Sequence, residues 1–206
     1  VQNNWKSESV LKNGKWLKIS TSGKGIYKIP YSRLKEWGLN NPSQVNVFGS
    51  GGTALSENPG EINYDDLVQV AVWHDNHNDT DCLFFYEPGT ITWRKDENTG
   101  DFIHQLNDYS TRGYFFLTED AGQLKKVERF PETEEAPTHR ISSFDACELY
   151  EIEKYNLLPG GSGKQWFSDK FINGTTKNFS FDLANLSNPG EVNIRINTAG
   201  RSSSPS

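Results

Sequence analysis

The chain has 206 residues, of which 34% are hydrophobic and 13% aromatic, with two cysteines and no methionine. Large rings supply enough apolar area for a folded core, so the composition excludes a disordered chain. The net charge of −6, without a Lys/Arg-rich block, excludes the basic surface that nucleic-acid binding requires. No run approaches the roughly 20 apolar residues of a membrane-spanning helix. Because the sequence begins at Val1 and lacks Met, we interpret it as a piece of a longer protein.

The first 130 residues predict short strands separated by Gly- and Pro-containing turns. Alternating runs at 16–20 and 26–29 flank a glycine-rich turn and predict a β-hairpin. Residues 31–37 lack Gly and Pro, which predicts one short helix. Residues 67–73 carry apolar side chains on both faces, as expected of a central strand. Further strands are expected at 45–48, 82–86, 90–93, 114–118 and 125–130.

A change in composition divides the chain. Residues 131–139 are acidic and contain two prolines, which predicts a linker between domains at 1–130 and 140–206. The fold class is all-β. We expect the first domain to be a mainly antiparallel β meander, barrel-like, with one short helix. We expect the second to be a partial β-sandwich of jelly-roll type.

Two strands are expected in the second domain, at 178–183 and 191–198, while residues 141–158 fit both helical and strand periodicity. About seventy residues are fewer than the ~100 that a β-sandwich usually needs, so we expect this domain to be cut short. Its unpaired edge beyond Glu191 then predicts a strand-exchanged homodimer.

The chemically densest stretch is 74–81, where Asp75, Asp79 and Asp81 are candidate ligands for Ca²⁺. A calcium loop of the EF-hand type requires Gly at its sixth position and Glu at its twelfth, and here these are Thr80 and Tyr86. A solvated acidic turn is therefore the favoured interpretation, and no cofactor is predicted. A zinc site with His74 and His77 is less favoured, because no second ligand pair follows.

No catalytic residue is predicted. Gly49-Ser50-Gly51-Gly52 lacks the Lys-Ser/Thr of a phosphate-binding loop, so it predicts a turn or bulge. Cys82 lies in an apolar run and Cys147 has acidic neighbours, and both settings disfavour the thiolate of a Cys–His nucleophile. His104 and His139 are the remaining candidate bases. Four acids are candidates for a glycosidase pair, although scattered acids are expected at this net charge: Asp65, Asp66, Glu119 and Asp120.

A series of short segments carries, through their order and spacing, a resemblance that runs from Gly14 to the end of the chain. These segments are 14–19, 25–29, 45–52, 65–68, 83–86 before Pro88-Gly89, 108–110, 114–118, 153–158 and 162–167. Together they resemble the type IX secretion system sortases of Bacteroidetes, the PorU-type family of gingipain-like C25 cysteine peptidases.

The resemblance implies the N-terminal region of a large secreted protein of the periplasm, outer membrane or cell surface. In that family a C-terminal cysteine peptidase domain removes sorting signals from cargo and attaches the cargo to surface lipopolysaccharide. The catalytic His and Cys motifs have no counterpart here, so this piece is predicted not to be an enzyme. Its expected partners are the peptidase domain of the parent chain and other secretion-system proteins. The resemblance also favours strand over helix at 141–158 and a variable loop at 74–81.

A carbohydrate-binding or adhesin-like surface module is the alternative. Trp93 and Trp166 flank polar loops and are candidates for stacking on sugars. Sequons at Asn78, Asn173, Asn178 and Asn185 do not separate the two hypotheses.

Overall fold

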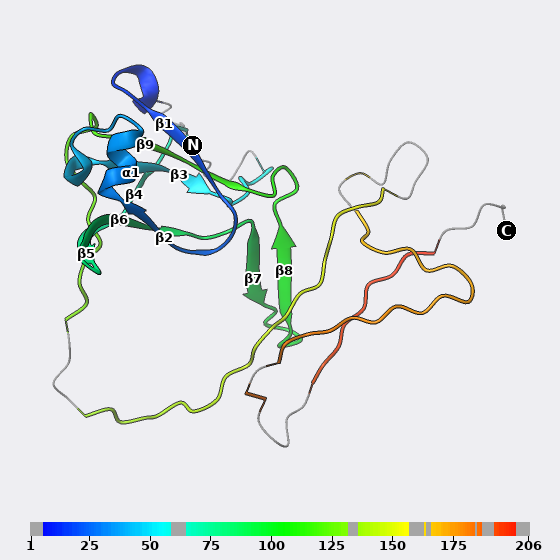
Figure 1. Cartoon of the computed structure of the whole chain (residues 1–206). Helices are drawn as coiled ribbons and strands as arrows, with labels where there is room; N and C mark the ends of the chain where they lie inside the picture. Colours follow the sequence, from blue (N-terminus) through cyan, green and yellow to red (C-terminus); the bar gives the residue numbers. More distant parts are fainter. Residues whose placement is uncertain are drawn as a thin grey trace. The chain divides into compact units, whose positions relative to one another are not determined.

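The computed structural model describes residues 6–58, 65–131, 136–156, 163, 166–183, 185–186 and 192–200. The chain divides into two compact units, Val1–Thr133 and Glu134–Ser206. All named elements lie in the first unit (Figure 1). They are η1 (Val10–Lys12), β1 (Leu17–Thr21), β2 (Gly25–Pro30), α1 (Tyr31–Glu36), η2 (Pro42–Gln44), β3 (Asn46–Gly51), β4 (Gln69–Val70), β5 (Val72–His77), β6 (Thr80–Glu87), β7 (Ile91–Lys95), β8 (Phe102–Leu106) and β9 (Gly113–Thr118).

The strands of the first unit form three antiparallel sheets. Sheet A has the order β1-β9-β3-β4, sheet B the order β2-β6-β5, and β7 and β8 form a two-stranded ribbon. The predicted antiparallel architecture with one short helix is confirmed. The described strands do not close into a barrel, and their order is not that of a simple meander, because β1 pairs with β9 and β2 with β6.

The hairpin predicted for the first two strands is wrong. β1 and β2 belong to different sheets, and the turn between them carries the chain from sheet A to sheet B. The hydroxyl of Tyr27 holds this turn, since it accepts a hydrogen bond from the Ser22 amide (2.9 Å) and donates one to the Gly23 carbonyl (3.1 Å). Alternation shows that each run is a half-buried strand but does not reveal its neighbour.

The core lies between sheets A and B. Phe85 of β6 meets Phe115 of β9 edge to face, with ring centroids 4.9 Å apart. Leu34 of α1 is fully buried in the same cluster, so the short helix closes one end of it. The buried apolar residues of this cluster are Ile29, Leu34, Leu39, Val45, Val47, Val72, Leu83, Phe85, Phe115 and Leu117.

The strand predicted at 67–73 is split. β4 is an edge of sheet A and β5 an edge of sheet B, so the expected central strand is wrong. The chain changes sheet at Ala71, which explains apolar residues on both faces of one run. The segment predicted as a strand at 125–130 forms only an isolated parallel bridge to Val72. The Val72 amide donates to the Lys125 carbonyl, and the Val127 amide donates to the Val72 carbonyl.

The second unit contains no strand among its described residues. Tyr155 and Phe167 form an isolated antiparallel bridge. The strands predicted at 178–183 and 191–198 are absent from the described residues there, as is a strand across 141–156. No backbone among the described residues completes a ladder for them, and Ile194 and Ile196 remain about three-quarters exposed, at 77% and 76%. The predicted sandwich is therefore not formed by the described residues.

No helix among the described residues combines the length and the apolar character needed to cross a bilayer.

Candidate functional site

The acidic stretch predicted as a possible calcium site forms the tip of the β5–β6 hairpin. Asn78 and Asp79 form its two-residue turn with φ of 52° and 58°. Asp75 lies opposite Cys82 and Asp81 opposite Asn76. Because directly opposed residues share a face and neighbours alternate, the Asp75 and Asp81 side chains point to opposite faces of the sheet. Within the described residues, no group of three or more His, Cys, Asp or Glu is placed to hold a metal ion.

The two histidines of this hairpin also point to opposite faces, so they do not form a zinc pair. His74 links three elements: its Nδ1 lies 2.8 Å from the Tyr31 hydroxyl and its Nε2 lies 3.3 Å from the Val45 carbonyl. In the consistent arrangement Nε2–H donates to the carbonyl, and Nδ1 accepts from Tyr31. Burial lowers the pKa of His74 below its ordinary value of 6.5, which keeps the ring neutral. No pattern in the residues around His74 indicates this bridge.

Neither cysteine is set up as a nucleophile. Cys82 is buried and its thiol donates to the Thr80 carbonyl at 3.3 Å. Cys147 is exposed, and desolvation together with Asp145 and Glu148 raises its thiol pKa. Both cysteines are free, and neither is hydrogen-bonded to a histidine within the described part of the chain. Neither His104 nor His139 is therefore placed as a base.

The four acids considered as a glycosidase pair instead hold loops. Asp120 accepts from the Lys15 amide at 2.7 Å, Glu119 from the Asn41 amide, and Asp65 from the Lys6 amide. Each of these carboxyl groups is thus engaged with a backbone amide far away in the sequence. This arrangement is structural and does not present two carboxylates to a common substrate.

Asp66 anchors the segment that contains η1. Its carboxylate accepts from the Val10 amide (2.6 Å), the Ser9 hydroxyl (2.9 Å) and the Leu67 amide (2.8 Å). Burial alone raises the pKa of Asp66, but these hydrogen bonds and nearby Lys6 outweigh it and hold the pKa below its ordinary value. Asp66 is therefore an ionised clamp on the N-terminal segment.

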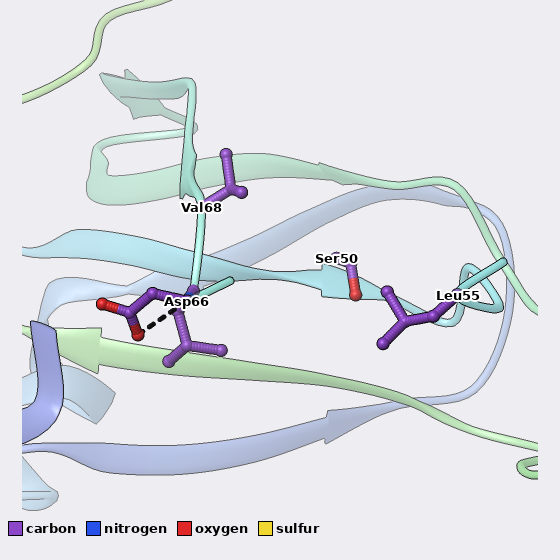
Figure 2. A pocket seen from close by; sticks show the side chains of 5 residues that line it. Ser50, Leu55, Asp66 and Val68 are labelled. Atoms are coloured by element: carbon purple, nitrogen blue, oxygen red, sulfur yellow. Dashed lines mark hydrogen bonds between the residues drawn. The ribbon is translucent and has the colours of Figure 1, made fainter. Parts of the chain in front are cut away.

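A shallow cavity of about 270 Å³ lies beside this clamp. Figure 2 shows Ser50 and Leu55, from β3 and the loop after it, opposite Asp66 and Val68. A second cavity of about 350 Å³ adjoins Leu55 and is lined by residues 53–57, Asn107 and Tyr109. The Asp66 carboxylate at the first cavity is already hydrogen-bonded to the protein, and Glu57 at the second cavity accepts from the Tyr109 hydroxyl.

The most unusual group in the first unit is Glu87, which sequence reasoning missed. It ends β6 between the two sheets and is completely buried. Its Oε1 accepts from the Gly52 amide (2.9 Å) and the Gly89 amide (2.8 Å), and its Oε2 accepts from the Thr21 hydroxyl (2.7 Å). No ion pair to Glu87 occurs among the described residues. The carboxyl group is thus satisfied by neutral donors from β1, the β3 end and the β6 end.

Glycines make room for this carboxyl group. A Cβ at Gly113 would stand 2.5 Å from Glu87 Oε2, and a Cβ at Gly51 would stand 2.7 Å from Oε1. Gly51 also has φ +62°, in the left-handed region. The glycine run predicted as a turn or bulge is indeed at a register shift between β3 and β9. It has the further role of surrounding a buried acid, which we call the Glu87 clasp (Glu87, Thr21, Gly51, Gly52, Gly89 and Gly113).

The tryptophans considered for sugar stacking are partly exposed. Trp93 of β7 is 40% exposed and its ring lies 5.2 Å from that of His104. Trp166, in the second unit, is 44% exposed. Trp73 of β5 is more exposed than either, at 54%, and lies beside Phe84 on the outer face of sheet B.

The described residues define an all-β, mainly antiparallel module, and within them no catalytic site is evident. Searches for similar proteins found no matching family model and no matching curated protein. Among solved structures, the chain is similar to dimeric latent PorU from Porphyromonas gingivalis, with 30% identity and a TM-score of 0.62. The match covers 78% of this chain and 14% of that one, so the chain spans a small part of that protein. The resemblance to PorU drawn from the sequence is thereby confirmed.

Proposed function

We propose that this chain is a non-catalytic β region of a larger secreted, surface-associated cysteine peptidase of the sortase type. Its role is to position or shield the peptidase domain, or to bind other secretion-system proteins. The observation that carries the proposal is the match to a small part of PorU, at 30% identity, by a module whose described residues assemble no nucleophile and base.

The chemistry of the module supports a structural role. Its buried polar groups are all hydrogen-bonded among the described residues, and the Glu87 clasp is one example. Perturbed, poorly satisfied groups in a cleft are typical of catalytic sites, and here the histidine and acids are used to join elements instead. Large apolar side chains, by contrast, remain exposed in both units. Such surfaces are typical of regions that bind other protein surfaces.

The test is an in-frame deletion of this region from the parent protein in the bacterium that encodes it. We expect the deletion to impair cargo processing at the cell surface although the peptidase domain is intact. The purified 206-residue chain should hydrolyse no peptide. Turnover by the purified chain that is lost in Cys147→Ala would contradict the proposal, as would normal processing by the deletion strain.

A carbohydrate-binding module is the second candidate, favoured by the partial exposure of Trp73, Trp93 and Trp166. Aromatic faces of this kind can stack on sugar rings. Calorimetric titration with surface polysaccharide separates the candidates: saturable binding that is lost in Trp93→Ala or Trp166→Ala, and retained in Phe130→Ala, would favour the carbohydrate module.

A homodimer formed by strand exchange is a further part of the proposal. Residues 192–200 carry exposed Val192, Ile194 and Ile196, whose alternation suits an added strand. Sedimentation velocity over a hundredfold range of concentration tests it. A sedimentation coefficient that stays that of a monomer would exclude the dimer.

A further inference from the structure

Sheet B carries apolar side chains on both faces, most of all in its central strand β6. In β6, Leu83 and Phe85 point into the core, while Phe84 and Tyr86 alternate with them and point outward. Strands of this kind normally have both faces covered, whereas a strand facing water on one side alternates apolar with polar residues. The sequence of β6 therefore fits a strand covered on both faces.

The register gathers the outward residues into one patch. Ile26 of β2 lies directly opposite Tyr86, and Trp73 of β5 lies directly opposite Phe84. The Trp73 and Phe84 rings are 5.4 Å apart. We call these four residues the outer face of sheet B. Ile26 is 75% exposed, Trp73 54% and Tyr86 50%, while Phe84 is partly buried beside Trp73.

On the outer face of sheet A, by comparison, one aromatic side chain covers another. Trp16 packs edge-on against Phe48 at 5.3 Å, and Phe48 is only 6% exposed. Lys18 lies 4.3 Å from the centre of the Tyr114 ring. Trp16 thus covers Phe48 on the outer face of sheet A, where Tyr114 is 39% exposed, whereas Ile26, Trp73 and Tyr86 of sheet B are each exposed by half or more.

We propose that the outer face of sheet B is a docking surface for an apolar surface of another domain of the same parent polypeptide. This rests on the proposed function, in which the chain is one region of a longer protein. The matched PorU chain supports it, because the match accounts for 14% of that chain and leaves most of it as potential cover. Lys28, Asp75 and His77 lie beside the apolar residues on the same face, as the polar rim of a protein interface would.

Ile26 within the patch favours a protein partner over a sugar, because an aliphatic side chain offers no flat face on which a sugar ring can stack. Trp and Tyr are the residue types that most often dominate protein interfaces. A partner domain in the same polypeptide can also bind at any protein concentration, because the covalent connection holds the two surfaces at a high effective concentration.

The experiment compares hydroxyl-radical labelling of two proteins, the 206-residue chain and the full-length parent, with residue rates read by mass spectrometry. In the 206-residue chain we expect Ile26, Trp73 and Tyr86 to label readily and buried Phe115 to stay protected. In the parent we expect the three rates to fall by at least about fivefold, because interface cores exclude water. The fall should be the same over a hundredfold dilution of the parent.

Three results would overturn the docking proposal. The first is equal labelling of the three residues in the chain and the parent. The second is protection in the parent that disappears on dilution, which would indicate a second copy. The third is protection already present in the 206-residue chain, or produced there by adding lipopolysaccharide. A parent without peptidase activity would instead overturn the proposed function and leave the labelling result to be judged separately.

A paired variant adds an independent readout. Trp73→Ser/Tyr86→Ser should leave the urea midpoint of the 206-residue chain nearly unchanged, and should increase the rate at which a protease cuts within this region of the parent. Phe130→Ser, at a residue that is 86% exposed and outside sheet B, is the matched control and should leave that rate unchanged. Equal protease rates for the paired variant and the control would contradict the docking surface.

Discussion

The Glu87 clasp yields a sharp prediction about stability. Glu87→Ala removes three hydrogen bonds and leaves the amides of Gly52 and Gly89 and the hydroxyl of Thr21 without their partner inside the protein. Each buried donor that loses its acceptor costs about 1–3 kcal/mol, and water entering the vacated space recovers a part, so we expect a loss of about 3–5 kcal/mol.

Glu87→Gln separates hydrogen bonding from charge. The amide oxygen of Gln can accept from both glycine amides in the place of Oε1, and the Thr21 hydroxyl can rotate to accept from the new NH₂ group. We therefore expect a cost of only about 1 kcal/mol. Glu36→Gln, at an exposed acid paired with Arg33, is the control and should change stability by less than about 0.5 kcal/mol.

The assay is urea unfolding followed by tryptophan fluorescence, with the free energy of unfolding compared between variants. Gly113→Ala places a methyl group against Oε2 and should cost about 2 kcal/mol by overpacking. Combined with Glu87→Ala, its cost should be about 1 kcal/mol less than additive, since the shortened side chain removes the clash with Oε2 while the clash with Thr21 Oγ1, also at 2.5 Å, remains. Equal losses for Glu87→Ala and Glu87→Gln, or strict additivity of the Gly113 pair, would refute the described geometry.

Three further predictions concern single groups. Because the pKa of His74 is lowered in the folded protein, the unfolded chain binds a proton there more readily. The free energy of unfolding should therefore fall as pH drops below about 6.5 and level off below the folded-state pKa. Urea midpoints between pH 5 and 8 should show this slope, and His74→Gln should flatten it. Asp66→Asn should raise the hydrogen-exchange rate of the Val10 amide by about tenfold or more without changing exchange in the core, because only the N-terminal clamp opens; unchanged exchange would contradict the clamp. Cys147 should react more slowly with iodoacetamide at pH 7 than the amino acid cysteine does, since its thiol pKa is raised, and neutralising Asp145 and Glu148 should speed the reaction. Buried Cys82 should stay unmodified until the chain unfolds. Mass spectrometry of labelled peptides measures both sites.

Strand positions in the first unit were largely predictable, but their partners were not. Alternation in residues 17–19 and 26–29 located β1 and β2, because burial on one face imposes a period of two. The same alternation cannot distinguish a hairpin from two strands in facing sheets. The single central strand predicted at 67–73 was wrong for a related reason. This run contributes first to sheet A and then to sheet B, so its mixed pattern resembled one strand with both faces buried.

The Glu87 clasp was beyond sequence reasoning because its members are dispersed. They come from β1 (Thr21), the turn after β3 (Gly52), β6 (Glu87) and β9 (Gly113). Each of them, taken alone, resembles an ordinary turn or strand residue. The acidic stretch at 74–81 shows the reverse case, in which residues close in sequence are separated by the alternation of a strand. In the second unit the patterns at 178–183 and 192–198 predicted strands, but a strand exists only where another backbone completes its hydrogen bonds.

The pairing of Leu17 with Leu117 has a consequence for how this protein is made. At roughly 5–20 residues per second, a ribosome needs on the order of 5–20 s to add the hundred residues that separate them. During that interval β1 has no β9 to pair with, and sheet A, in which β9 lies between β1 and β3, cannot assemble. The nascent β1 therefore stays unpaired until nearly all of the first unit has emerged, whereas the strands of sheet B are complete once Glu87 has been added.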